Sequence, residues 1–354
     1  MPRPLARLSI PALLLAALGA APAAADAPEV VASIKPVHSL VAGVMGDLGT
    51  PSLLVSGSDS PHTYAMKPSE AAALSRAAIV FWIGEELETF LAQPIANLGA
   101  NARSVALIDS PGMTVLQYED DHGEEAGHDD DHDDHAGHGH SHGHDAHDHD
   151  DDHGHSHASD GHDDDDHGHS DAAHVHDHDH DGADPHVWLD PRNAVKMVDN
   201  IAATLADADP ANAATYHANA EALRERLHDL EHEIADRLSA YRDVPYMTFH
   251  EAFRYFDARF GLDSHGAITV NPDRQPSARR LGEIRETIGG FDRVCIFAEP
   301  QFPPKMVAVI VEGTAARTGT LDPLGAELEP GADLYPRLLQ LNSENFAECF
   351  ASTM

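Results

Sequence analysis

Short apolar segments alternate with longer segments of helical periodicity in the first third of this chain. Four apolar runs have the length of β-strands: residues 29–34, 52–55, 78–83 and 104–108. Helical patterns lie between them at residues 37–45, from a start at residues 67–70, and at residues 86–98. Strands that alternate with helices predict βαβ units and a mostly parallel sheet.

The same alternation returns in the last third of the chain. Strands are predicted at residues 245–249, 266–270, 294–297 and 319–321. Helices are predicted at residues 252–260, 277–288, 304–316 and 334–351. The sequence therefore predicts an α/β fold with two lobes, each a roughly four-stranded, mostly parallel sheet flanked by helices.

A long helical pattern lies between these two halves. A helix at residues 192–206 is followed by residues 211–241, which contain no Pro or Gly. Leu223, Leu227, Leu230, Ile234 and Leu238 recur there at steps of three and four. A helix of about thirty residues would be roughly 45 Å long. We expect it to run along the outside and join the lobes; pairing in a coiled coil is the alternative.

Residues 119–184 have a different composition. They hold 20 of the chain's 28 His and 25 acidic residues, with no Lys or Arg. Such a run cannot bury enough apolar surface to offset its ordering entropy, so we expect disorder. His-rich tracts bind borderline divalent metals such as Zn, Cu, Ni and Co. The alternative interpretation is a solvating acidic loop.

The N-terminus has the pattern of an export signal. Arg3 and Arg7 precede an apolar segment at residues 10–20 that is too short to span a bilayer. Residues 23–25 are a small-residue cleavage site, so the cut is placed after Ala25. An N-terminal membrane anchor is the alternative. No later segment is apolar enough to insert into a membrane, so we expect an exported, periplasmic protein.

These features give a predicted domain organisation: a signal peptide at 1–25, an N-terminal lobe at 26–206 carrying the insertion 119–184, a linking helix at 207–241 and a C-terminal lobe at 242–354. The formal charge of −38 stems mostly from the insertion. The remainder is still acidic, which argues against a nucleic-acid partner.

The chain has two cysteines, Cys295 in a buried-looking strand and Cys349 near the C-terminus. In an oxidising compartment an even pair tends to form a disulfide. Two metal-binding thiolates are the alternative, although no CxxC or neighbouring His pattern accompanies either residue.

Four isolated side chains are candidate metal ligands. Ligands of open α/β sheets bind just outside the carboxyl ends of the strands. His62 follows the second predicted strand, His186 follows the insertion, and His250 and Asp322 end strands of the second lobe. Three imidazoles and one carboxylate form a four-coordinate site suited to Zn²⁺. A single His at a strand end is more often merely hydrogen-bonded, but three in matching positions favour a site.

The remaining five His are interpreted as surface residues or as neighbours of the site: His38, His217, His228, His232 and His265. Among them, His228 and His232 have the i, i+4 spacing that can hold a metal on a helix.

Five ordered motifs resemble one protein family. They are SPHTYAMKPS at 60–69, DPHVWLDP at 184–191, FHEAF at 249–253, FAEPQF at 297–302 and LDPLG at 321–325. The whole mature chain resembles the periplasmic metal-binding proteins of ABC importers, in particular their zinc-specific, ZnuA-like branch, whose members carry His-rich insertions at this place. The resemblance implies two α/β lobes joined by one long helix, with metal in the cleft between them.

The resemblance also implies roles for individual residues. It identifies His62, His186 and His250 as the three imidazole ligands, and His250 favours zinc because manganese-binding relatives usually have Glu there. Some zinc-binding members have Glu before the first His, whereas this chain has Pro61. That departure leaves the fourth ligand open between Asp322 and water. Cys295 and Cys349 match a disulfide pair of zinc-binding relatives.

The predicted function is high-affinity capture of Zn²⁺, as transported ligand, by a monomer that delivers it to an inner-membrane permease with a cytoplasmic ATPase. The His-rich insertion would act as an auxiliary metal collector. A metal storage or chaperone protein is one alternative. A secreted zinc metalloenzyme is another, with Glu299 or Glu251 as its base. We expect no enzyme, because HExxH, a nucleophile elbow and a Gly-rich phosphate loop are all lacking.

Overall fold

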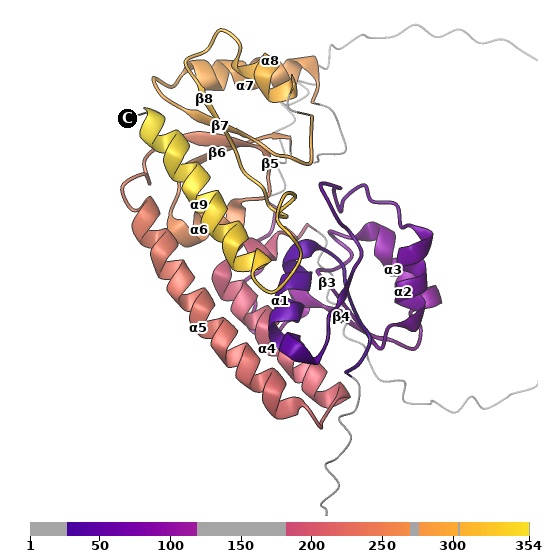
Figure 1. The fold of residues 1–354 in the computed structure, drawn as a ribbon. Helices are drawn as coiled ribbons and strands as arrows, with labels where there is room; N and C mark the ends of the chain where they lie inside the picture. The colour runs from indigo at the N-terminus through magenta and orange to yellow at the C-terminus, as the bar shows by residue number, and fades with distance from the viewer. Residues whose placement is uncertain (1–26, 119–181, 270–275, 304, 354) are drawn as a thin grey trace, which may run out of the picture. The chain divides into compact units, whose positions relative to one another are not determined.

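The computed structural model describes residues 27–118, 182–269, 276–303 and 305–353. They form two four-stranded sheets in which every strand pair is parallel, in the orders β2-β1-β3-β4 and β6-β5-β7-β8. The two orders are the same when each sheet is numbered from its own first strand. Both sheets therefore repeat one topology, and the predicted α/β fold class is confirmed (Figure 1).

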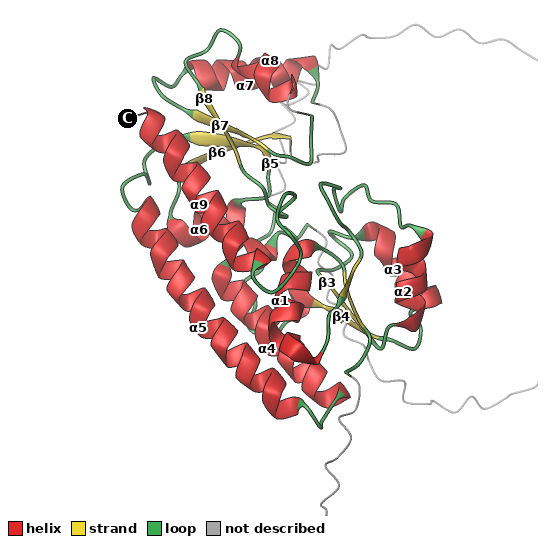
Figure 2. Cartoon of the chain, in the orientation of Figure 1, coloured by secondary structure: helices red, strands yellow, loops and turns green. Residues whose placement is uncertain are grey.

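Helices cover both faces of the N-terminal sheet. Its strands are β1 Val30–Ala32, β2 Ser52–Leu53, β3 Ile79–Trp82 and β4 Arg103–Ala106. Its helices are α1 Lys35–Met45, α2 Pro68–Arg76 and α3 Thr89–Leu98. Figure 2 shows α2 and α3 together on one side of the strands, with α1 and α4 on the other. Strand β3 is buried at all four positions, as expected for a central parallel strand.

The C-terminal sheet has the same layered arrangement. Its strands are β5 Tyr246–His250, β6 Ser264–Thr269, β7 Cys295–Ala298 and β8 Arg317–Thr320. Its helices are α6 Arg254–Phe260, α7 Ala278–Gly289, α8 Lys305–Val311 and α9 Leu334–Thr353. Helices α7 and α8 lie on one side of the strands and α9 on the other (Figure 2).

Two long helices connect the sheets. Helix α4 covers Pro191–Ala208, and α5 covers Ala213–Leu238, so α5 is shorter than predicted. Its buried residues include all five apolar positions of the predicted stripe. Helix α5 packs against α1 and α4 and also against α6 and α9. It is thus a partner of both sheets, although the domain boundaries given above remain predictions.

Both sheets share one hydrophobic core. A continuous cluster of buried side chains includes Val30 and Phe81 of the first sheet and Tyr246 and Phe297 of the second. Residues of α1, α4, α5 and α9 lie between them in the same cluster. Apolar contacts therefore tie the two sheets together, in addition to the long helix that joins them.

Two elements near the C-terminus differ from their predicted bounds. Helix α8 ends at Val311 instead of residue 316, because Gly313 adopts a left-handed turn with φ 77°. Strand β8 begins at Arg317 instead of residue 319, and its residues are mostly exposed. A polar edge strand does not have the apolar signal from which strands are predicted.

The predicted signal peptide and nearly all of the His-rich insertion lie outside the described residues. The insertion's two ends do meet: Tyr118 N donates to Gly182 O at 2.7 Å, and Asp184 N donates to Leu116 O at 2.8 Å. The second of these bonds involves Asp184, which is two residues before His186 in the sequence. Within the described part of the chain, no helix combines the length and apolar character that crossing a bilayer requires.

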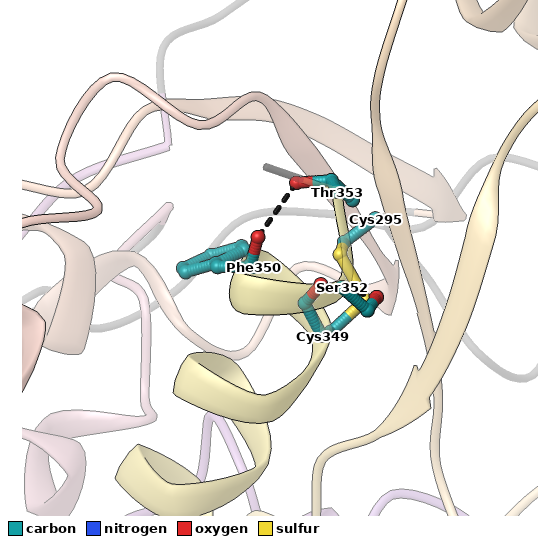
Figure 3. Close-up of a disulfide and its surroundings, with 5 residues drawn as sticks. All are labelled: Cys295, Cys349, Phe350, Ser352 and Thr353. Carbon is teal, nitrogen blue, oxygen red and sulfur yellow. Dashed lines mark hydrogen bonds between the residues drawn. A yellow bond between two sulfur atoms is a disulfide. The ribbon is translucent and has the colours of Figure 1, made fainter.

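A disulfide joins Cys295 of β7 to Cys349 of α9 (Figure 3). Both residues are buried. The predicted pairing is confirmed, and the alternative of two metal-binding thiolates is thereby excluded, since both sulfur atoms are used.

The loop after β8 is attached to the N-terminal sheet by a buried lysine. Lys35 Nζ donates to the carbonyls of Gly325 at 2.8 Å, Ala326 at 2.7 Å and Leu328 at 3.0 Å. Three acceptors satisfy all three protons of the ammonium group. Lys35 thus fixes the position of this loop relative to α1.

We predict that Lys35→Met lowers the free energy of unfolding of the metal-free protein by about 1–3 kcal/mol, because three part-buried carbonyls lose their donor. Urea denaturation at pH 7 measures the effect. Lys305→Met, at an exposed position, is the matched control and should change stability little. An equal effect of both substitutions would contradict the role given to Lys35.

Candidate metal centre

Two of the predicted ligands follow or end strands, and a third precedes a short helix. His62 lies in the turn-rich loop after β2, His186 precedes the short helix Val187–Leu189, and His250 is the last residue of β5. The loop of His62 is held by Tyr64, whose hydroxyl donates to Glu70 Oε1 at 2.7 Å. Glu70 Oε2 in turn accepts from Lys67 N at the start of α2. Local structure therefore positions each imidazole.

The structure brings these three imidazoles together. One ring nitrogen from each of His62, His186 and His250 lies within 4.8 Å of the others. The ring centroids are 5.5 Å apart for His62 and His186, 5.9 Å for His62 and His250, and 5.1 Å for His186 and His250. In the described residues, they form the only group of three or more His, Cys, Asp or Glu with this geometry.

Buried carboxylates orient two of the rings. His186 Nδ1 lies 2.8 Å from Asp184 Oδ1, and His250 Nδ1 lies 2.6 Å from Glu299 Oε2. The same carboxylates accept from the backbone N–H of His186 and His250. Because a carboxylate only accepts, each Nδ1 must carry the proton. The Nε2 lone pairs of His186 and His250 then face each other at 3.2 Å.

A small cavity lies against the three rings. Its volume is about 10 Å³, roughly that of one water-sized sphere. Trp188, Phe302 and Leu324 give it apolar walls. Gln301 also lines it, and its Oε1 is buried without a hydrogen-bond partner, while its Nε2 donates to Asp322 Oδ1. The site is thus shaped for one small polar or ionic occupant.

Asp322, the fourth predicted ligand, does not join this group. Its Oδ1 accepts from the N–H groups of Leu324 and Gly325, and its Oδ2 accepts from Ala326 N at 2.6 Å. These bonds fold the loop whose other side is held by Lys35. In this structure, therefore, Asp322 organises a loop beside the cavity and does not supply a ligand atom to the His group.

Sequence reasoning missed the supporting carboxylates. Asp184 lies in the DPHVWLDP motif, but the sequence analysis predicts no role for it. Glu299 is considered there only as a catalytic base. Its two oxygens are used by His250, which leaves it poorly placed to act on a substrate. An Asp two residues before a candidate His is the signal that could have indicated Asp184.

Among the other His, one prediction was wrong. His38 is buried and its Nε2 lies 3.1 Å from the carbonyl of Pro51, so it is neither a surface residue nor part of the site. His217, His228, His232 and His265 are exposed, as predicted.

Burial makes His62 and His186 hard to protonate. Desolvation, with the neighbouring His186 and His250, lowers the pKa of His62 to about 2. Desolvation also lowers the pKa of His186, although the Asp184 carboxylate opposes it. Neutral imidazoles are the form that binds metal, so protons compete weakly here at neutral pH.

The lowered pKa of His62 predicts a pH dependence of stability. In the unfolded chain His62 takes up a proton below pH 6.5, whereas in the folded chain it stays neutral down to about pH 2. The unfolded state then binds more protons, so stability is full above pH 6.5 and falls below it by at most roughly 1.4 kcal/mol per pH unit. Urea denaturation of the metal-free protein at pH 7 and pH 5 measures this loss.

Carboxylates also titrate in this range, so a variant is needed as the reference. His62→Gln removes the titrating group and should lose less stability than the wild type between pH 7 and pH 5. Equal losses in the two proteins would show that His62 is not held in its neutral form.

The comparisons with known proteins show the family of this chain. The family described as "ZnuA: Zinc-uptake complex component A periplasmic" matches residues 30–349, which include all three imidazoles. The chain belongs to the ZnuA family. It is 45% identical to the high-affinity zinc uptake system protein ZnuA of Brucella suis over 91% of each chain. It is 39% identical to that of Paracoccus denitrificans over 96% of this chain and 98% of the relative.

A solved structure named "Crystal structure of ZnuA" has the same fold. It superposes with a TM-score of 0.68 and 25% identity, covering 92% of this chain and all of the other. The ZnuA-family resemblance recognised in the five motifs is therefore confirmed. Proteins of this family take part in zinc uptake and are not enzymes.

Proposed function

We propose that this ZnuA-family chain captures Zn²⁺ in the periplasm through His62, His186 and His250. One observation carries the proposal: the Nε2 atoms of His186 and His250 face each other at 3.2 Å while both Nδ1 protons are committed to carboxylates. Two lone pairs at this distance repel unless a cation lies between them. Tetrahedral zinc with Zn–N bonds of about 2.0–2.1 Å separates two ligand nitrogens by about 3.4 Å.

The donor set favours zinc over harder cations. Three neutral imidazoles suit Zn²⁺ and its neighbours in the transition series, whereas Mg²⁺, Ca²⁺ and Mn²⁺ prefer oxygen ligands. Asp184 and Glu299 fix the orientation and the tautomer of the imidazoles that they hold, as such carboxylates do in zinc proteins. We assign the fourth position to a water molecule, with Gln301 Oε1 as its hydrogen-bond acceptor.

The captured ion is the protein's transported ligand in this proposal. The chain would leave the cytoplasm by its predicted signal peptide and, as a monomer, present zinc to an inner-membrane permease driven by a cytoplasmic ATPase. Its relatives' names place them in zinc uptake systems, which supports such a partner. The His-rich insertion would act as an auxiliary metal collector.

Isotopic zinc uptake tests this function. A bacterium lacking its own copy of this gene should take up little ⁶⁵Zn from zinc-poor medium, and the intact chain should restore uptake. His250→Ala, exported to the same level, should fail, whereas the exposed-His control His217→Ala should succeed.

Two outcomes would contradict the proposal. Full uptake with His250→Ala would show that zinc transport does not require the cavity. Normal initial uptake without the gene, accompanied by a smaller periplasmic zinc content, would favour the storage or chaperone alternative.

A further inference from the structure

A second pair of imidazoles lies outside the cavity, on the exposed face of α5. His228 and His232 are one helical turn apart, and their Nε2 atoms lie 3.3 Å from each other. The ring centroids are 4.6 Å apart with an interplanar angle of 72°. The His228 side chain is 67% exposed. Both ring nitrogens therefore converge on one point at the protein surface.

The separation of these nitrogens fits a shared metal ion. Two nitrogens bound to one tetrahedral zinc at about 2.0–2.1 Å lie about 3.4 Å apart. The pair on α5 nearly reproduces this distance, as does the pair of His186 and His250 at 3.2 Å. Histidines at positions i and i+4 of a helix are also the spacing with which known zinc proteins bind metal from one helix face.

The surroundings of the pair favour a cation. His228 lines an open hollow together with Glu225 and Asp229, and the Asp229 carboxylate is 3.9 Å from His228 Nδ1. Glu225 is one turn before His228 on the same helix. Arg224 also lines the hollow, but its guanidinium is paired with Asp199 at 2.6 Å and with Glu221. The positive charge of Arg224 is thus neutralised by two carboxylates.

We propose that His228 and His232 form a second, exposed metal site that binds borderline divalent cations such as Zn²⁺, Cu²⁺ and Ni²⁺. Two imidazoles supply the protein ligands, and water completes the coordination. The site binds more weakly than the three-imidazole cavity, because it has fewer protein ligands and lies in water. It exchanges metal with the solution and works whether or not the cavity is intact.

Histidine labelling in the intact chain tests the proposal, because it reports each residue separately from the His-rich insertion. Diethyl pyrocarbonate modifies unliganded imidazoles, and peptide mass spectrometry reads the modification at His228, His232 and His217. When free Zn²⁺ exceeds the dissociation constant of the site about tenfold, only about a tenth of the pair stays free. Labelling of His228 and His232 should fall to that level, while labelling of the exposed His217 should stay unchanged.

Single variants separate a shared site from independent effects. In His232→Ala, zinc should no longer protect His228, and in His228→Ala it should no longer protect His232. His217→Ala should leave the protection intact. These positions are exposed on a long helix, so the variants should fold, which circular dichroism checks.

Two results would contradict the proposed site. Zinc-independent labelling of the pair would show that the 3.3 Å contact is only a hydrogen bond between two imidazoles. Protection of His228 that persists in His232→Ala would show that the pair is not the site. The triple variant His62→Ala/His186→Ala/His250→Ala should retain the protection, so the outcome does not depend on the proposed zinc transport.

Discussion

Replacing His250 with alanine should lower the zinc affinity of the cavity by more than the 10–100-fold that loss of an outer-shell partner typically costs. The substitution removes one of three nitrogens that converge within 4.8 Å. It also leaves Glu299, which is 3% exposed, without the Nδ1 donor to which it is bonded. Competition with a zinc chelator of known affinity measures the loss.

Glu299→Gln tests the carboxylate that is hydrogen-bonded to His250. Glutamine keeps the shape and can still accept from Nδ1, but it removes the negative charge that strengthens the imidazole as a ligand. Its zinc affinity should fall about 10–100-fold, between the wild type and His250→Ala. His217→Ala is the control and should bind as tightly as the wild type. Wild-type affinity in His250→Ala would refute the assignment of this ligand.

Removing the disulfide should lower the free energy of unfolding by about 4 kcal/mol, because the loop that it closes in the unfolded chain is long. The two cysteines are 54 residues apart in the sequence. The bridge ties α9 to β7. Helix α9 also contacts the loop beside the cavity, because Asn342 Nδ2 donates to Asp322 O at 2.7 Å. Denaturant unfolding of the wild type and of Cys295→Ala/Cys349→Ala measures the difference.

The zinc affinity of the folded double variant should stay close to that of the wild type, because neither cysteine lines the cavity. A reducing agent should destabilise the wild type and leave the double variant unchanged. Identical unfolding midpoints for oxidised and reduced wild type would contradict a stabilising role of the bridge.

The order of elements was predictable from the sequence because each central strand is an apolar run and α5 carries a regular stripe of leucines. His62 and His250 were predictable because ligands of parallel sheets bind just outside the carboxyl ends of the strands, and His186 because it lies in one of the five motifs. Strand β8 was misplaced because it is a polar edge strand, and α8 was predicted too long because its end depends on the conformation of Gly313.

The long-range side-chain hydrogen bonds could not be predicted from the sequence. Glu299 is 49 residues from His250, and Lys35 is 290 residues from Gly325, so neither contact leaves a local pattern. Asp322 lies two residues after the last strand, and its carboxylate binds backbone amides. Whether an acid at a strand end faces a cavity or caps its own loop depends on the path of the following residues.

Zinc titration of the mature protein, with chelator competition and with added Mn²⁺, tests the central claim most directly when the wild type is compared with His62→Ala/His186→Ala/His250→Ala. We predict one tight site per chain in the wild type that Mn²⁺ does not displace. The triple variant should retain only weak binding of several ions. Tight binding that survives in the triple variant would instead identify the His-rich insertion as the main zinc site and would favour a storage function.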